Sequence, residues 1–163
     1  MILVELTNRQ SRLRIDETRL RDAIRTVLLG EGLADGQVSV AVVDGPEMHE
    51  LNRRHLAHDF PTDVLSFVLE RDGETLDGEI VVSADEAILN APKYGWPPEA
   101  ELTLYAIHGA LHLCGYDDLD AASAEVMRAR ERHWLAQEGL PSAGRDAAGP
   151  LVETQPGVAE NRP

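Results

Sequence analysis

The sequence predicts an α+β protein in which helices pack against a small mixed sheet of about four strands. Strand-like and helix-like patterns alternate in the first half of the chain, helical patterns dominate the second half, and one helical segment is apolar on nearly every side. A length of 163 residues fits one domain. We place this domain at residues 1–139 and predict a disordered tail at 140–163, which is rich in Gly, Pro and Ala.

The first strands and the first helix follow from hydrophobic periodicity. Residues 2–6, ILVEL, and 37–43, QVSVAVV, are typical of strands. Between them, residues 16–30 form an amphipathic pattern with Asp16 as a plausible N-cap and Gly30 as the stop. The order strand, helix, strand is therefore predicted for this part of the chain.

The middle of the chain predicts a short helix and two more strands. Residues 44–56 form the helix, with Pro46 near its first turn. The strands are expected at Asp63–Leu69 and Glu79–Ser83, on either side of a polar connection that contains glycine.

Helices are expected through most of the remaining chain. Ser83 and Glu86 form a capping-box pattern that starts one helix. Residues 99–114 form a second helix with hardly any polar face in its second half, which indicates burial on most sides. A last helix is expected over residues 120–138.

Charge and composition limit the partners of the chain. The net charge of −14 argues against binding nucleic acid through the bulk electrostatic field, so an anionic substrate must meet a local basic patch. We expect no DNA partner. No run of 18 apolar residues is present and the N-terminus lacks signal-peptide features, so no membrane partner is expected. The single cysteine, Cys114, excludes an intrachain disulfide, favours a cytoplasmic location and is expected to be a buried thiol.

Two histidines lie one helical turn apart in the buried helix. His108 and His112 leave the same face, and two imidazoles so placed can hold one metal ion. The alternative is a pair of core histidines satisfied by hydrogen bonds, but burying two imidazoles without a partner is costly. Gly115 ends the helix, so the chain can turn back and bring a carboxylate to the two histidines as a third ligand. The candidates for the third ligand are Asp117, Asp118 and Asp120. The set predicts a catalytic site for one Zn²⁺ per chain, although nickel, cobalt or iron could bind the same ligands.

The residue after the first histidine disfavours one class of zinc enzyme. Gly109 stands where the HExxH metalloproteases have their glutamate general base. A peptidase of that type is therefore disfavoured, and no general base can be named from the sequence.

Three sequence blocks resemble one family. HGALHLCGYDD, residues 108–118, resembles the HGxLHLxGYDH signature of the YbeY family of metal-dependent endoribonucleases. Residues 51–67 resemble that family's LN…D.PTDVLSF segment, and residues 77–83 its GDI.IS strand. The blocks occur in the family's order, and the resemblance spans residues 35–137.

The resemblance implies an α+β fold and a zinc held at the two histidines and the last position of the motif. Carried onto this chain, the catalytic and metal-binding residues are His108, His112 and Asp118. The implied activity is single-strand-specific RNA cleavage, with roles in 3′-end maturation of the small-subunit (16S) ribosomal RNA and in ribosome quality control. Ribosomal proteins and a ribosome-assembly GTPase are implied as further partners.

The chain departs from the family pattern at the third ligand, because Asp118 stands where histidine is usual. A carboxylate oxygen binds zinc at a distance similar to an imidazole nitrogen. The exchange lowers the net charge of the site by one and makes the metal a weaker Lewis acid. Asp117 matches the family's aspartate and is expected to orient a ligand or cap the turn.

A second departure concerns substrate binding, because Leu56 occupies a position where many family members have arginine. The neighbouring Arg53, Arg54, His55 and His58 could compensate, although an ordinary solvated helix face explains them equally well. Asp63 and Ser66 could touch substrate, and turn chemistry explains them nearly as well. The candidates for substrate contact are thus Arg53, Arg54, His58, Asp63 and Ser66.

Two other functions stay open. The chain could be a ribosome-binding assembly factor whose metal is structural, since its acidic surface suits basic ribosomal proteins. A zinc peptidase or amidase is a less favoured alternative, since it would share the helix geometry.

Overall fold

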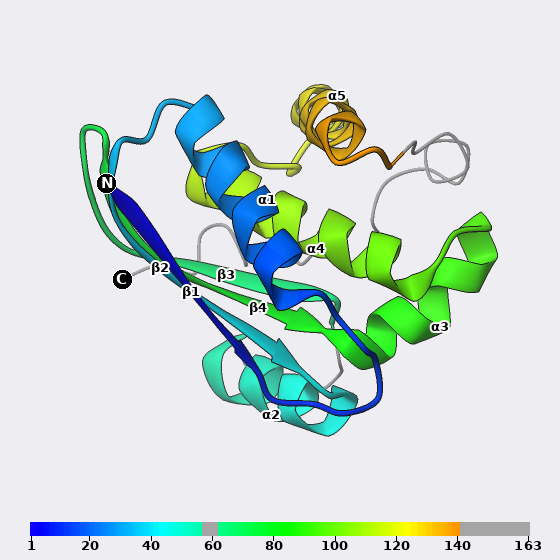
Figure 1. Ribbon diagram of the computed structural model, residues 1–163. Coiled ribbons are helices and arrows are strands. Elements are labelled where there is room, and N and C mark those ends of the chain that lie inside the picture. The colour runs from blue at the N-terminus through cyan, green and yellow to red at the C-terminus, as the bar shows by residue number, and fades with distance from the viewer. Residues whose placement is uncertain (57–61, 141–163) are drawn as a thin grey trace.

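Four strands form one mixed sheet (Figure 1). They are β1 (Ile2–Asn8), β2 (Asp35–Val43), β3 (Val64–Asp72) and β4 (Thr75–Ser83), in the order β1-β2-β4-β3. β2 pairs in parallel with both β1 and β4, whereas β3 pairs antiparallel with β4. This computed structural model describes residues 1–56 and 62–140, so the predicted tail, except Leu140, lies outside the described residues. The predicted fold class is confirmed.

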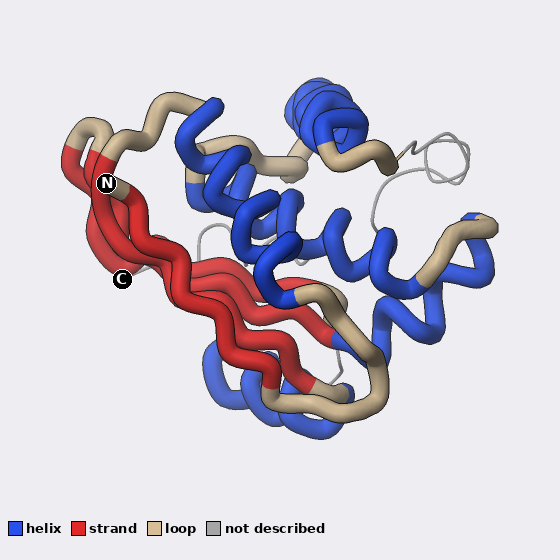
Figure 2. Tube along the Cα trace, viewed as in Figure 1, coloured by secondary structure: helices blue, strands red, loops and turns tan. Residues whose placement is uncertain are grey.

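Five helices of the described residues surround the sheet. They are α1 (Glu17–Gly30), α2 (Gly45–Leu56), α3 (Ala84–Tyr94), α4 (Pro98–Leu113) and α5 (Ala121–Gln137). As Figures 1 and 2 show, α1 and α4 cover one face of the sheet and α2 lies on the opposite face. α5 packs on α4, on the side away from the sheet. None of the helices in the described ranges is both long enough and apolar enough to cross a bilayer.

The two faces of the sheet bury different clusters because side chains alternate along each strand. Val38, Val40 and Val42 of β2 belong to the main core beneath α1 and α4. Met48 of α2 packs with Leu65 on the other face, in a smaller cluster. The main core therefore lies on the face that α4 covers.

Helix α4 is buried along most of its length, as its sequence predicts. It contacts α1, α3, α5, β3 and β4. A Cβ at Gly109 would lie 2.9 Å from Cγ2 of Ile80 and 3.1 Å from Cγ2 of Val64. Because glycine has no Cβ, the middle of the helix can approach the sheet this closely.

The local capping signals predict the starts of two helices correctly. The Asp16 carboxylate accepts the backbone N–H of Arg19 at the start of α1, and Ser83 Oγ accepts that of Glu86 at the start of α3. These bonds satisfy backbone donors that lack a partner within the helix.

One sequence expectation is wrong in detail. The polar connection expected between Leu69 and Glu79 is mostly strand, because β3 and β4 continue to the pair Asp72–Thr75. Gly30 ends α1, as predicted, and the positive φ that follows the helix lies at Gly32, at 102°. At Gly30 a Cβ would instead collide with the Trp134 ring, so close packing of α5 explains this glycine.

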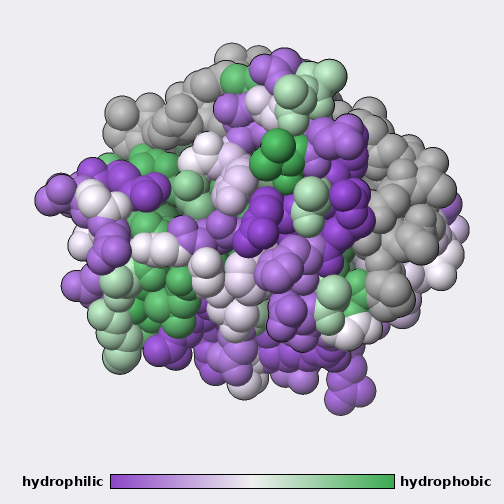
Figure 3. Space-filling view, turned by 90° about the horizontal axis from the view of Figure 1, so that it is seen from above, coloured by the Kyte–Doolittle hydropathy of each residue, from purple (hydrophilic) through white to green (hydrophobic). Residues whose placement is uncertain are grey.

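The surface seen from above, over α5, is mostly hydrophilic (Figure 3). Hydrophobic residues on this face lie in small separate groups. Val126 of α5 is an apolar side chain that is half exposed.

Candidate metal centre

The buried helix α4 holds the two histidines against each other. The Nε2 atoms of His108 and His112 lie 3.0 Å apart. Their rings meet edge to face, with 4.6 Å between the centroids and an angle of 80° between the planes. The exposed fractions are only 1% and 4%. The i, i+4 spacing on one helix face therefore brings the two rings together, as expected.

A glycine turn after α4 returns the chain to the histidines. Gly115 has φ of 104°, its N–H donates to His112 O at 3.0 Å, and Tyr116 N–H donates to Leu111 O at 3.1 Å. This pair of bonds is a Schellman motif, which needs a residue that tolerates positive φ. The turn brings Oδ2 of Asp118 to 3.6 Å from Nε2 of His108. Oδ1 of Asp118 lies 3.8 Å from Nε2 of His112.

Of the three candidate aspartates, the structure brings Asp118 to the histidine pair. Within residues 1–56 and 62–140, one group of side chains qualifies as a metal-ligand set: His108, His112 and Asp118, whose ligand atoms all lie within 4.8 Å of one another. Asp117 accepts the N–H of Leu119 at 3.3 Å, in keeping with its predicted turn role. Asp120 caps α5 by accepting the N–H of Ser123 at 2.7 Å.

The partners of the Nδ1 atoms fix the tautomers of both rings. His112 Nδ1 lies 2.9 Å from the backbone carbonyl oxygen of Tyr116. A carbonyl oxygen can only accept, so this nitrogen carries the proton. His108 Nδ1 lies 2.5 Å from Oε2 of Glu131, which as a carboxylate also accepts. In the neutral rings both Nε2 atoms are therefore left with lone pairs.

This donor set fits a metal ion. Two lone pairs 3.0 Å apart repel each other unless a proton or a metal ion lies between them. Two nitrogens on one tetrahedral zinc are about 3.3 Å apart, given zinc–nitrogen bonds of about 2.0–2.1 Å. The observed separation is close to that value, and Asp118 adds a carboxylate from the same side. The residues present thus fit a His-His-carboxylate metal site.

Sequence reasoning missed Glu131, which accepts a hydrogen bond from Nδ1 of His108. Glu131 lies on the buried stripe of α5 together with Met127, Trp134 and Leu135. A glutamate among apolar residues at helical spacing was the available signal, because a buried carboxylate needs a partner. Metal-ligating histidines commonly donate their second N–H to such a carboxylate.

Burial and nearby charges shape the electrostatics of the site. Burial raises the pKa of the Asp118 carboxyl, the positive charge of His108 in its protonated form opposes this rise, and the negative charge of Glu131 adds to it. Two carboxylates beside two neutral imidazoles favour a bound cation. Cys114 follows the helix and is half-buried, and burial raises the pKa of its thiol to about 12. It is not a member of the metal-ligand set of the described residues.

The predicted substrate residues lie away from the histidine pair or beneath α4. Arg53 donates to Glu50 at 2.6 Å on α2, and α2, which also carries Arg54, packs on the opposite face of the sheet. Asp63 and Ser66 are buried, and Asp63 together with burial raises the pKa of Tyr105. His58 and the side chains of His55 and Leu56 lie outside the described residues. Tyr105 is buried in the core.

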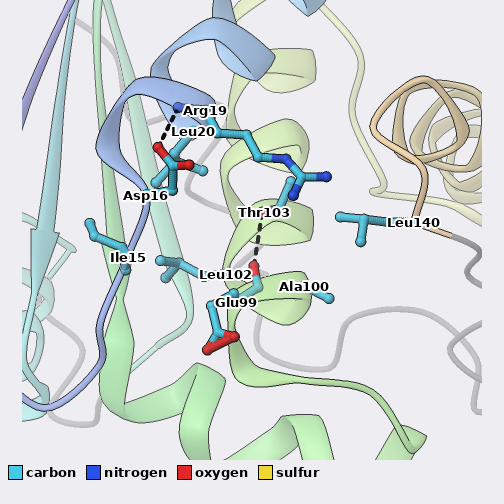
Figure 4. Close-up of a pocket in the computed structure, with 9 residues that line it drawn as sticks. All are labelled: Ile15, Asp16, Arg19, Leu20, Glu99, Ala100, Leu102, Thr103 and Leu140. Atoms are coloured by element: carbon cyan, nitrogen blue, oxygen red, sulfur yellow. Dashed lines mark hydrogen bonds between the residues drawn. The ribbon is translucent and has the colours of Figure 1, made fainter.

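A separate cavity of about 200 Å³ lies between α1, the first turns of α4 and Leu140 (Figure 4). Its lining residues are Ile15, Asp16, Arg19, Leu20, Glu99, Ala100, Leu102, Thr103 and Leu140. Glu99 and Thr103 are joined within one helical turn by a hydrogen bond of 2.8 Å between the Thr103 hydroxyl and the Glu99 carbonyl. None of the candidate metal ligands lines this cavity.

Helix α5, which carries Glu131, is hydrogen-bonded to Glu31 at the C-terminal end of α1. Oε2 of Glu31 accepts two hydrogen bonds from Arg130, at 2.7 and 2.9 Å, and one from Nε1 of Trp134 at 2.7 Å. Oε1 accepts the hydroxyl of Tyr116 at 2.8 Å. Burial would raise the pKa of Glu31, but the bonds from Trp134, Arg130 and Tyr116 outweigh it and lower the pKa below 4.5.

This carboxylate should make stability pH-dependent. Because the folded-state pKa of Glu31 lies below its unfolded value, the stabilisation is complete above about pH 4.5 and is lost as the pH falls through the folded-state pKa. Glu31→Gln should lower the free energy of unfolding of the metal-free protein by about 2 kcal/mol at pH 7. Urea unfolding at pH 7 and pH 3 measures the difference. An equally large difference at both pH values would contradict this account.

Fold and site together define a mixed α/β protein whose central buried helix presents a His-His-carboxylate metal-ligand set. Comparison with known proteins identifies the family. The model of the family described as "Endoribonuclease YbeY" matches residues 5–139. The chain belongs to the YbeY endoribonuclease family, and the predicted membership and enzyme class are confirmed.

Relatives of this family match over most of the chain. An endoribonuclease YbeY of Carboxydothermus hydrogenoformans is 38% identical over 143 residues, which cover 85% of this chain and 99% of the relative. One of Chlorobaculum tepidum is 40% identical over 121 residues, covering 74% and 88%. A solution structure of a Thermotoga maritima protein matches with a TM-score of 0.59 and 27% identity, covering 96% of this chain and 99% of that one.

Proposed function

We propose that this protein is a zinc-dependent endoribonuclease that cleaves single-stranded RNA at the centre formed by His108, His112 and Asp118. The observation that carries the proposal is the convergence of two Nε2 lone pairs and one carboxylate in the middle of a buried helix and its turn. Membership of the YbeY family supports RNA as the substrate.

The residues around the ligands hold protons in place. Glu131 keeps a proton on Nδ1 of His108, and the Tyr116 carbonyl keeps one on Nδ1 of His112, so both Nε2 atoms face the same point. Asp118 adds negative charge that stabilises a dication there. A metal bound at this point supplies Lewis acidity toward a phosphodiester group.

We propose small-subunit (16S) ribosomal RNA as the physiological substrate, with 3′-end maturation and quality control as the process. The resemblance of residues 108–118 to the family signature supports this assignment. Basic ribosomal proteins and an assembly GTPase are proposed partners, and the net charge of −14 suits contact with basic proteins. Arg53, Arg54 and His58 stay proposed substrate contacts, with the two arginines binding parts of the RNA away from the metal centre. Asp63 and Ser66, at 0% and 2% exposed, are too buried to touch an RNA. The cytoplasm stays the proposed location.

One observation favours a second candidate function. The two histidines are almost fully buried, which is typical of a structural metal, and Asp118 weakens the Lewis acidity of a bound ion. An assembly factor with a structural metal would bind ribosomal components without turnover. A peptidase is disfavoured further, because the packing of Gly109 against Ile80 leaves no room for a glutamate at that position.

The test compares two aspartates of the same loop. Metal content and cleavage of an end-labelled single-stranded RNA, and of the same strand in a duplex, are measured for the native protein, Asp118→Ala and Asp120→Ala. We expect about one zinc per chain and single-strand cleavage in the native protein and in Asp120→Ala, and loss of both in Asp118→Ala. Cleavage that survives removal of metal by a chelator would contradict metal dependence. Zinc without any cleavage of RNA would favour the assembly factor.

A further inference from the structure

We propose that Glu31 is a positioning residue for the metal centre, because its carboxylate fixes the groups that hold both imidazoles. The inference rests on the metal site of the proposed function and deepens it. Glu31 lies at the C-terminal end of α1 and touches neither histidine in the contacts of the described residues. Its side chain is only 8% exposed.

The first connection runs through Tyr116 to His112. The Tyr116 hydroxyl donates to Oε1 of Glu31 at 2.8 Å, and the backbone carbonyl of the same tyrosine accepts the Nδ1 proton of His112. Tyr116 is therefore held at its side chain by Glu31 and holds His112 with its backbone. A displaced tyrosine would move the carbonyl that orients the ring.

The second connection runs through α5 to His108. Arg130 and Trp134 both donate to Oε2 of Glu31, and Glu131 next to Arg130 binds Nδ1 of His108. The Trp134 ring packs against Gly30, directly before Glu31. The depth to which α5 docks against α1 therefore sets the position of the Glu131 carboxylate.

A glutamine cannot make all the hydrogen bonds of this carboxylate. The carboxylate accepts four hydrogen bonds, and both of its oxygens are used. A glutamine offers one accepting oxygen and an NH₂ group that would face donors. Arg130 would also lose its charged partner. Glu31→Gln keeps the shape of the side chain but breaks at least one connection.

The experiment measures metal affinity and ring geometry in four variants. Glu31→Gln tests both connections, Tyr116→Phe the one to His112, and Trp134→Phe the one to His108. Asp16→Ala is the matched control, because it removes the N-cap at the other end of the same helix. Affinity for Zn²⁺ and Co²⁺ is measured by competition with a chelating dye, and geometry by the visible spectrum of the Co²⁺ form and by imidazole ¹⁵N NMR.

We expect Glu31→Gln to bind metal about tenfold more weakly and to change the Co²⁺ spectrum. About tenfold is the low end of the loss in affinity caused by removing a residue that hydrogen-bonds a metal ligand directly. Tyr116→Phe should change the NMR signals of His112 more than those of His108, and Trp134→Phe should do the reverse. Asp16→Ala should lower the melting temperature and leave affinity and spectra unchanged. Native-like affinity and spectra in Glu31→Gln would overturn the proposal, as would equal losses in the Asp16→Ala control.

This design separates the inference from the proposed function. Imidazole NMR of the metal-free protein reports the Nδ1 hydrogen bonds even if the native protein cleaves no RNA. If the native protein binds metal without cleaving RNA, the proposed activity fails and the affinity measurements still decide the role of Glu31. If Glu31→Gln leaves both histidine signals unchanged in the metal-free protein, the role of Glu31 is wrong whatever the activity.

Discussion

His112→Ala is expected to abolish metal binding at neutral pH and to reduce RNA cleavage by at least about 100-fold. Outer partners of a metal ligand already contribute up to about 100-fold to affinity or activity, and a direct ligand contributes more. The His112 ring also keeps the Nε2 of its neighbour His108 directed at the same point, 3.0 Å away. Zinc content and single-strand cleavage of the purified variant measure both effects.

The control for this variant is His49→Ala. His49 lies on α2, across the sheet from α4, and its removal should leave zinc content and cleavage unchanged. His112→Gln is a second variant, because glutamine fills more of the space of the imidazole ring than alanine does and should disturb the fold less. Circular dichroism checks that both variants are folded. Full zinc content in both His112 variants would show that the metal is held elsewhere.

Glu131→Ala is expected to weaken metal binding by about 10–100-fold without removing a direct ligand. The substitution leaves the Nδ1 proton of His108 buried without its acceptor 2.5 Å away, which should also destabilise the fold by about 1–3 kcal/mol. Glu131→Gln keeps an accepting oxygen and loses only the charge, so its effect should be smaller. Chelator competition and urea unfolding give the two quantities.

The matched control for Glu131 lies on the same helix. Glu125 is a highly exposed glutamate of α5 whose contact with Arg128 is 3.9 Å long. Glu125→Ala should change metal affinity by less than about twofold, because exposed ion pairs of this kind contribute little. If Glu131→Ala and Glu125→Ala bound metal equally well, the hydrogen bond to His108 would have no part in the metal centre.

Much of the fold was predictable because its signals are local. The caps at Asp16 and Ser83, the apolar stripe of α1 and the buried pattern of α4 each lie within a few consecutive residues. The two strands of the β3–β4 hairpin were predicted, but its outer end was not, because that end is exposed and carries charged side chains from Glu70 to Asp72. Backbone pairing with β4, which no side-chain pattern reports, makes this segment a strand.

The metal centre shows the same division. The two histidines, the glycine turn and Asp118 were predictable because they follow one another in a single motif. Glu131 lies 23 residues from His108, and Glu31 lies 85 residues from Tyr116, so only the packing of α5 and α1 reveals them. A charged residue on the buried face of a helix, as at Glu131, was the one local sign of a role in supporting the metal centre.

The closeness of the candidate ligands in sequence has a consequence for the order of folding. His108, His112 and Asp118 come from one helix and its turn, so a nascent α4 with its glycine cap already presents them all. The carboxylate of Glu131 arrives only when α5 docks. We therefore expect the metal of the proposed function to bind a partly folded chain weakly and the native chain tightly. By thermodynamic linkage, a bound ion then favours the docked position of the last helix over the open one.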